Sequence, residues 1–287
     1  MNATALLVLL AAAILHAGWN LLVKQADEKY VFTWWALVAG SILFSPMLFQ
    51  AASWPSRIWP YALASALCEA VYFVALATAY RLADFSLVYP LARGTAPLLL
   101  ALGSVVFLKE KLSPGGVLGL SLLILGLLVV GTTGTKRTER IPRTSQPSWA
   151  GVAAALAVAV LIALYTVIDG AAVRFVPPGP YNGLVLGLTA MFLTPFILVR
   201  YDRRTLLAEW RRHGWRIVAV GALLLLSYGL VLYAYTFARV AYAGAVREVS
   251  VVFAALAGWW LGEPMGRLRL LGAVLICAGI GLIALAG

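Results

Sequence analysis

The sequence predicts an all-α polytopic membrane protein, with ten transmembrane helices arranged as two inverted repeats of five. Three observations predict this fold class. The 287 residues are 63% hydrophobic and 11% charged, whereas a soluble domain carries about 25% charged residues. The charged residues gather between long apolar runs, as membrane spans require. Finally, one short pattern of residues occurs twice, about half a chain apart.

The repeated pattern is an acidic residue followed by two glycines. In both copies the first glycine lies nine positions after the acidic residue and the second lies seven further on. The two triples are Glu110, Gly119, Gly126 and Glu263, Gly272, Gly279, with an offset of 153 residues at each position. A half-length repeat in a chain this apolar is typical of a transporter built from two related halves. The glycines allow close helix approach, and such faces also suit a homodimer.

Ten stretches are apolar and approach the length of about 20 residues that a span needs. They are residues 3–23, 31–50, 59–80, 85–107, 115–131, 149–170, 180–199, 216–238, 241–261 and 268–286. The most polar stretch outside them, residues 132–148, has no apolar run, which indicates a linker. The predicted units are residues 1–131 and 149–287, each with five spans. Because five is odd, the second unit enters the membrane from the opposite side, so the repeats are inverted.

The charge distribution narrows the classes of partner. The net charge is +11, but the basic residues lie mostly in short loops, so we expect no nucleic-acid binding and regard anionic membrane lipid as their partner. Fifteen of the 22 Lys and Arg residues lie in loops on one side and five on the other. The positive-inside rule then places both termini outside the cytoplasm.

Nothing in the sequence indicates an enzyme. We find no nucleotide-binding glycine loop, no cluster of metal ligands and no set of nucleophile and base, and the loops leave no room for a soluble catalytic domain. We therefore expect no cofactor and no metal. Cys68 and Cys277 each lie inside an apolar run without a redox or metal spacing, which indicates small packing residues.

Charged residues inside the spans are the strongest indication of a site. Each costs roughly 2.5–3.5 kcal/mol at the helix centre and is a functional hypothesis by default. Arg93 lies in span four, and Arg247 and Glu248 lie in span nine. The offset of 153 residues carries Arg93 to the position next to Arg247, so inverted repeats bring the two arginines towards each other. They form an anion-binding pair, or they neutralise Glu248 and Glu69 and hold helices together; the two interpretations are compatible.

Further candidates share helical faces with one another. The candidates for lining a cavity are Tyr89, Glu69, Tyr72, Trp19 and Asn20. His16 and Glu69 are candidates for proton coupling, because histidine titrates near neutral pH and buried acidic groups form proton relays in transporters. For His16, a role in packing fits the sequence equally well.

Other polar residues of the spans have structural interpretations. Pro90 and Pro97 are expected to bend span four. Asp169 shares a face with Tyr165 and is expected at the membrane edge. Glu110 and Glu263 end spans four and nine, and we interpret both as caps or loop contacts.

Several features together resemble the EamA family of the drug/metabolite transporter superfamily. They are the ten spans in halves of five and the span ends Leu-Lys-Glu-Lys-Leu and Leu-Gly-Glu-Pro-Met, each followed by glycines. The stretch Tyr-Pro-Leu-Ala-Arg-Gly resembles a subgroup of which some members are associated with phosphonate use. The resemblance implies a central cavity between the halves and, often, export of amino acids or other small metabolites. It also implies cytoplasmic termini, contrary to the charge count, so both orientations stay open.

The sequence therefore predicts a secondary transporter, an exporter of a small anionic or zwitterionic metabolite such as an amino acid or a phosphonate-like compound. It would work by alternating access as a multi-pass protein of the cell membrane, the inner membrane of a bacterium. Two alternatives remain: a non-transporting membrane protein for assembly or lipid handling, and a lipid-headgroup flippase. A closed, dry interface between the halves would favour the first, and a side opening wide enough for acyl chains would favour the second.

Overall fold

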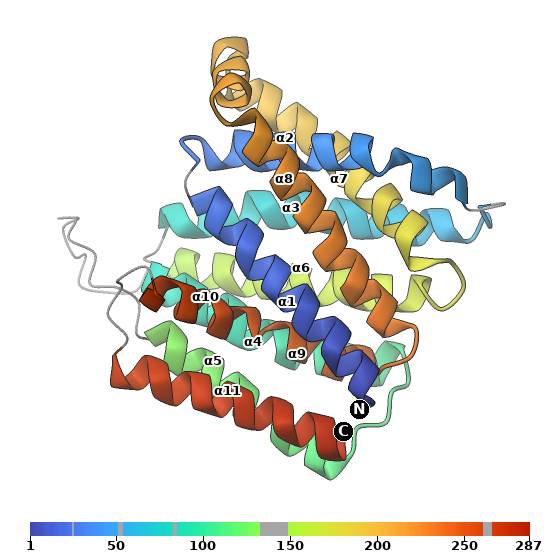
Figure 1. Ribbon diagram of the computed structural model, residues 1–287, viewed down its shortest axis with the longest axis vertical. Helices are drawn as coiled ribbons and strands as arrows, with labels where there is room; N and C mark the ends of the chain where they lie inside the picture. The colour runs from blue at the N-terminus through green and yellow to red at the C-terminus, as the bar shows by residue number, and fades with distance from the viewer. Residues whose placement is uncertain (25, 51–53, 83–84, 133–148, 261–265) are drawn as a thin grey trace.

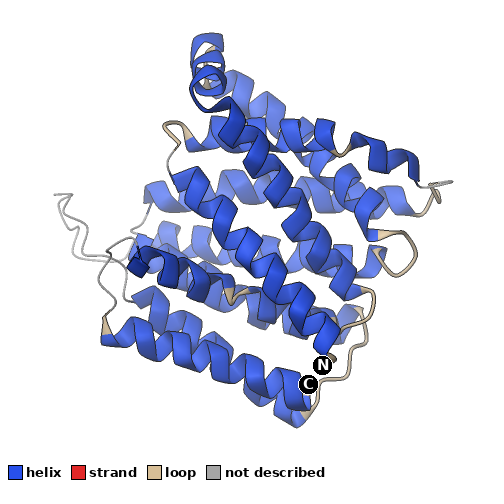
Figure 2. Cartoon of the chain, viewed as in Figure 1, coloured by secondary structure: helices blue, strands red, loops and turns tan. Residues whose placement is uncertain are grey.

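The computed structural model describes residues 1–24, 26–50, 54–82, 85–132, 149–260 and 266–287, and every regular element in these ranges is helical (Figures 1 and 2). The elements are α1 Ala3–Lys24, α2 Lys29–Leu43, the 3₁₀ helix η1 Ser45–Gln50, α3 Ile58–Leu82, α4 Phe85–Phe107, α5 Pro114–Thr132, α6 Trp149–Ala172, α7 Pro178–Arg200, α8 Arg203–Tyr235, α9 Val240–Arg247, α10 Ser250–Trp260 and α11 Arg267–Ala286. The all-helical fold class is confirmed.

The helices correspond to the ten predicted spans, with three differences. Eight stretches are long and apolar enough to cross a membrane, and two shorter apolar helices, Lys29–Leu43 and Leu91–Phe107, complete the set. Span two ends as an α-helix at Leu43, before Pro46, because a proline has no amide for the carbonyl four residues back and its ring clashes with that carbonyl. Span eight starts thirteen residues earlier than predicted, at Arg203, and span nine is divided into α9 and α10.

The strongest helix packing joins the first repeat to the second. α5 packs against α11, α3 and α4 pack against α6, and α1 and α2 pack against α8. Figure 1 shows the result as an interleaved stack, in which helices of the two halves alternate. The halves are therefore interlocked along most of their length, and residues from both can meet in the interior.

The glycines of the repeated pattern form the contact between α5 and α11. A Cβ atom added at Gly119 would lie 2.7 Å from the carbonyl oxygen of Gly279, and one added at Gly126 would lie 2.7 Å from that of Gly272. The reverse contacts are equally close, since a Cβ atom at Gly279 would lie 2.5 Å from the carbonyl oxygen of Gly119. The two backbones thus meet directly, as the glycine spacing predicted. Glu263, the acidic member of the second triple, lies outside the described residues.

Both termini lie on the same side of the helix stack (Figure 1). The amino group of Met1 donates to the carbonyl oxygen of Ala284 at 3.0 Å and to that of Gly287 at 3.3 Å. Two of the loops that carry basic residues, the α1–α2 connection and the start of α8, lie on the opposite side, the side of the basic loops (Figure 1). On that side α8 begins after Asp202, whose carboxylate accepts from the hydroxyl and the amide of Thr205. These bonds hold the pKa of Asp202 below its ordinary value.

The contact of α5 with α11 predicts that alanine substitutions at two neighbouring glycines change the stability of the protein differently. Gly279→Ala should lower the free energy of unfolding by about 1–3 kcal/mol, the usual cost of overpacking, because the new methyl group meets the backbone of α5. Gly281→Ala should leave stability unchanged or raise it, because nothing lies within 4 Å of its Cβ position and alanine is the better helix former. Thermal unfolding of the purified proteins in detergent measures both, and equal effects at the two sites would contradict this contact.

Candidate functional site

An ion cluster made by both repeats lies in the interior of the helix stack. Nη1 of Arg93 on α4 donates to Oε2 of Glu248 at 3.1 Å and to Oε1 at 3.4 Å. Nη2 of Arg247 lies 3.5 Å from the same Oε1. The side chains of Arg247 and Glu248 are 8% and 4% exposed, and that of Arg93 is 23% exposed. The offset of the repeat thus predicted the approach of the two arginines, and one carboxylate lies between them.

Glu248 lies at the break in span nine. α9 ends at Arg247 and α10 begins at Ser250. Across the break the amide of Glu248 donates to Ala245 and the amide of Val249 to Val246, three residues back in each case. The chain therefore tightens into 3₁₀-type geometry, which redirects the side chains at the break, and such interruptions often mark functional positions. Span four, in which Pro90 and Pro97 predicted a bend, is a single helix in the structure.

The first repeat also holds the start of α9. Oε1 of Glu110 accepts from the amide of Val240 at 2.7 Å, and Oε2 accepts from that of Ala241 at 3.1 Å. Arg174 pairs with the same carboxylate at 3.7 Å. Glu110 thus satisfies two amides that a helix N-terminus leaves without partners, and its negative charge complements the helix dipole. The prediction of a capping role for Glu110 is confirmed, and the capped helix belongs to the other repeat.

Two buried carboxylates lie close to the ion cluster. Glu69 on α3 accepts from the hydroxyl of Thr189 on α7 at 2.9 Å. Asp169 on α6 accepts from the hydroxyl of Tyr181 at 2.7 Å and from that of Tyr228. Asp169 is fully buried, and its place at the membrane edge stays a prediction. Only three residues of α6 follow it, and Tyr181 on α7 and Tyr228 on α8 cover its carboxylate.

Aromatic rings fill the space between these groups. The rings of Tyr72 and Tyr165 lie 6.3 Å apart, as do those of Tyr165 and Tyr228, and both pairs meet edge to face. Tyr72 and Tyr165 are only half-buried, like Arg93. The sequence predicted that Tyr72 lines a cavity, and in the structure Tyr72, Tyr165 and Tyr228 form a row of rings across α3, α6 and α8. The row brings aromatic faces and hydroxyl groups to the edge of the ion cluster.

The remaining predicted residues are on α1 and α4. His16 interacts electrostatically with Arg93 and Arg247, and its ring packs edge to face on that of Trp19 at a centroid distance of 4.9 Å. Asn20 is exposed, and its side-chain amide donates to the carbonyl oxygen of His16 at 2.7 Å. The side chain of Tyr89 lies outside the described part of the structure.

The larger of two cavities in the described residues is not lined by Arg93 or Arg247. It has a volume of about 190 Å³ and lies between α2, α3 and α7, towards the side of the basic loops. Tyr30, Thr78, Arg81, Arg200 and Tyr201 line its polar part. A smaller apolar cavity adjoins it and shares Tyr30, Val74 and Phe196 with it. Neither of these two cavities is lined by Arg93, Arg247 or Glu248.

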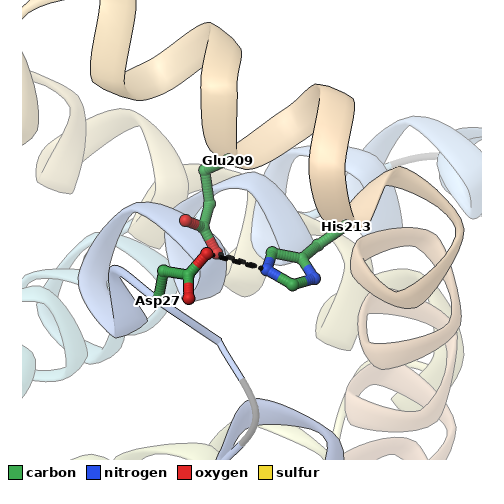
Figure 3. Close-up of side chains that lie close together, drawn as sticks. All are labelled: Asp27, Glu209 and His213. Carbon is green, nitrogen blue, oxygen red and sulfur yellow. Dashed lines mark hydrogen bonds and ion pairs between the residues drawn. The ribbon is translucent and has the colours of Figure 1, made fainter.

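One group of side chains in the described residues has the composition and spacing of metal ligands. It consists of Asp27, Glu209 and His213, away from the ion cluster (Figure 3). Sequence analysis did not identify it, because Asp27 and His213 are 186 residues apart. The one local signal was the four-residue spacing of Glu209 and His213 on a helix.

Comparisons with known proteins agree with this architecture. The model of the EamA-like transporter family matches residues 3–132 and 149–285. No curated protein matches the chain. One solved structure, a crystal structure of a protein, superposes with a TM-score of 0.77 over 98% of this chain and 96% of that chain, at 20% sequence identity. At this identity the likeness shows the fold alone.

The ion cluster yields a prediction about stability. Glu248→Gln should destabilise the protein by about 3–5 kcal/mol, the cost of breaking a buried ion pair, because both guanidinium groups lose their shared carboxylate. Adding Arg247→Met should recover part of the loss, because it removes one uncompensated charge. Thermal unfolding of the single and double variants measures this coupling. A double variant less stable than Glu248→Gln alone would show that Glu248 is not the counter-ion of Arg247.

Proposed function

This chain belongs to the EamA-like transporter family and is a secondary transporter, and we propose that its substrate is a small anionic or zwitterionic metabolite bound at Arg93 and Arg247. The observation that carries this proposal is that two guanidinium groups share one carboxylate in the interior. The three side chains comprise two guanidinium groups and one carboxylate, and the carboxylates of Glu69 and Asp169 interact with Arg247 from further away. Nε of Arg247 is buried and has no hydrogen-bond partner among the described residues.

An anionic substrate group matches this arrangement chemically. Guanidinium groups bind carboxylates and phosphonates through paired hydrogen bonds and keep their charge at any physiological pH. A bound anion would take the place of Glu248 on one arginine and would leave Glu248 paired with the other. Exchange between an internal and an external anion avoids leaving either guanidinium without a partner, which is costly in a low-dielectric interior.

A zwitterionic substrate such as an amino acid fits the surroundings of the cluster. The carboxylates of Glu69 and Asp169 both interact electrostatically with Arg247. Either carboxylate could receive an ammonium group. The rings of Tyr72 and Tyr165 offer aromatic faces to the same cation. The carboxylate of the substrate would then face the arginines and its amine would face the acidic pair.

The composition of the ion cluster also fits alternating access. Its groups are contributed by α4 of the first repeat and by the break in span nine of the second. Relative movement of the repeats would therefore separate Arg93 from Glu248 and open the site, as expected for transporters built from inverted repeats. We propose export as the direction and the inner membrane of a bacterium as the location.

A lipid-headgroup flippase is the second candidate, favoured by the cavity between α2, α3 and α7 with Arg81 and Arg200 at its polar end. Its volume of about 190 Å³ is below the ~300 Å³ at which pockets for drug-sized ligands begin. A small free metabolite is therefore the better-supported substrate.

The arginines give the direct test of the substrate class. Purified protein in detergent should be stabilised against heat by at least one compound in a panel of amino acids, phosphonates and carboxylates. Arg93→Gln and Arg247→Gln should each weaken the binding of that compound by at least tenfold, since a charged hydrogen bond contributes about 1.5–3 kcal/mol. Each should also slow its transport in proteoliposomes by at least tenfold. The control Arg57→Gln, an exposed arginine over the ring of Phe175, should behave as wild type.

Normal insertion of both variants together with transport of anionic substrates at the original rate would contradict the assignment. Stabilisation by lipid headgroup analogues alone would support the flippase.

Coupling to protons is the accompanying prediction for Glu69. In proteoliposomes, a proton gradient directed opposite to the substrate flux should accelerate transport. Glu69→Gln should abolish this dependence and retain exchange of substrate for substrate, because the amide keeps the hydrogen bond of Thr189 and cannot carry a proton. Transport indifferent to the gradient in the wild type would indicate facilitated diffusion.

A further inference from the structure

The group of Asp27, Glu209 and His213 lies where the two repeats meet outside the hydrocarbon core. Asp27 is in the connection between α1 and α2, and Glu209 and His213 lie four residues apart on α8 (Figure 3). α8 has 33 residues, about 50 Å at 1.5 Å per residue, which exceeds the ~30 Å of a hydrocarbon core. Its first turns carry arginines at positions 203, 204, 211, 212 and 216, so we place them in the headgroup region and beyond.

The three side chains point their ligand atoms at one another. Nε2 of His213 lies 3.3 Å from Oδ2 of Asp27 and 3.8 Å from Oε1 of Glu209. One ligand atom from each residue lies within 4.8 Å of the other two. Tetrahedral zinc with bonds of about 2.0–2.1 Å separates its ligands by about 3.4 Å. Small side-chain rotations therefore suffice to bring all three onto one ion.

The burial of the Glu209 carboxylate is an independent indication of a bound cation. Glu209 is 4% exposed, and its Oε1 atom has no hydrogen-bond partner among the described residues. Its other oxygen accepts from the amide of Glu28 at 3.3 Å, which fixes the orientation of the carboxylate. A buried carboxylate oxygen without a donor is costly, and a cation placed between Glu209 and His213 would satisfy it.

The surroundings match a metal site in two further respects. The side chain of His213 is 8% exposed, and that of Asp27 is 50% exposed, so two ligands are shielded and the third gives an entry path from water. The ring of Phe32 meets that of His213 edge to face at a centroid distance of 6.0 Å. It limits the rotation of the imidazole and keeps Nε2 directed at the carboxylates.

We propose that Asp27, Glu209 and His213 bind a divalent transition-metal ion, for which Zn²⁺ is the best fit. A set of one imidazole and two carboxylates selects Zn²⁺ over Mg²⁺ and Ca²⁺, which prefer oxygen ligands throughout. Three protein ligands leave the fourth tetrahedral position to water. Because Asp27 belongs to the first repeat and the other two ligands to the second, bound metal links the repeats on the side of the basic loops.

The competing explanation is an ion pair without metal, in which a protonated His213 bridges the carboxylates. Arg212 bears on this choice, because its Nη1 lies 2.8 Å from Oδ2 of Asp27, the same oxygen that contacts His213. In an ion-pair cluster Arg212 adds stability. At a metal site Arg212 competes with the ion for Asp27. Removing Arg212 therefore only lowers stability if the cluster is an ion pair, whereas it strengthens metal binding if the cluster is a metal site.

The test is direct metal binding to the full chain. Protein with Cys68→Ala and Cys277→Ala, purified in detergent without a histidine tag and stripped of metal, is titrated with ZnCl₂. We expect one Zn²⁺ per chain, with Kd in the micromolar range or below, no displacement by millimolar Mg²⁺, and a rise in Tm with Zn²⁺ concentration. Co²⁺ should give the visible absorption of a four-coordinate site. These readouts are independent of transport and of its substrate.

Variants assign the ligands. His213→Ala and Glu209→Gln should each weaken Zn²⁺ binding by at least a hundredfold, and Glu28→Gln, which retains the backbone amide used by Glu209, should bind as wild type. Arg212→Ala should bind Zn²⁺ more tightly than wild type, a gain that a misfolded variant cannot give. Wild-type binding no tighter than that of His213→Ala would overturn the proposal. So would the absence of binding at 100 µM Zn²⁺, or weaker binding by Arg212→Ala.

Discussion

A charge in the interior of a membrane needs a partner of opposite charge, and this constraint governs the centre of the protein. Arg93 and Arg247 both pair with Glu248, and the side chains of Arg247 and Glu248 are buried, where an unpaired charge is costly. Their meeting requires α4 of one repeat to pass the break in span nine of the other. The break in turn requires a fixed start for α9, which Glu110 provides from the first repeat. The ion cluster, the broken helix and its cap are therefore one connected unit.

The packing of the two repeats against each other couples the ion cluster to any movement of the halves. The main helix contacts join one half to the other, so any relative movement of the halves changes the interior contacts as a set. Arg93 and Glu248 lie on opposite halves, whereas Arg247 and Glu248 are neighbours in sequence and move together. In the proposed transport cycle, the pair of Arg247 and Glu248 would persist while the pair of Arg93 and Glu248 separates. An anionic substrate would compensate the separated pair.

Sequence patterns predicted the features that depend on period and spacing. Ten spans followed from apolar run length, and the 153-residue offset brought Arg93 next to Arg247 without any local motif. The patterns failed where contacts come from distant helices. Asp169 near the end of its span gave no sign of the two tyrosines that cover it. Asp27 lies far in the sequence from Glu209 and His213, so their convergence required the packing of α1 and α2 on α8.

The reciprocal contact of α5 with α11 has a consequence for the origin of the chain. Gly119 of the first repeat faces Gly279 of the second, and Gly126 faces Gly272. Applying the offset of the repeat to either pair yields the other pair. A surface that is complementary to itself in this way is isologous, the type of interface found in homodimers with a twofold axis. A single five-helix ancestor, inserted into the membrane in both orientations, could have paired through these same glycines before duplication joined two copies in one chain.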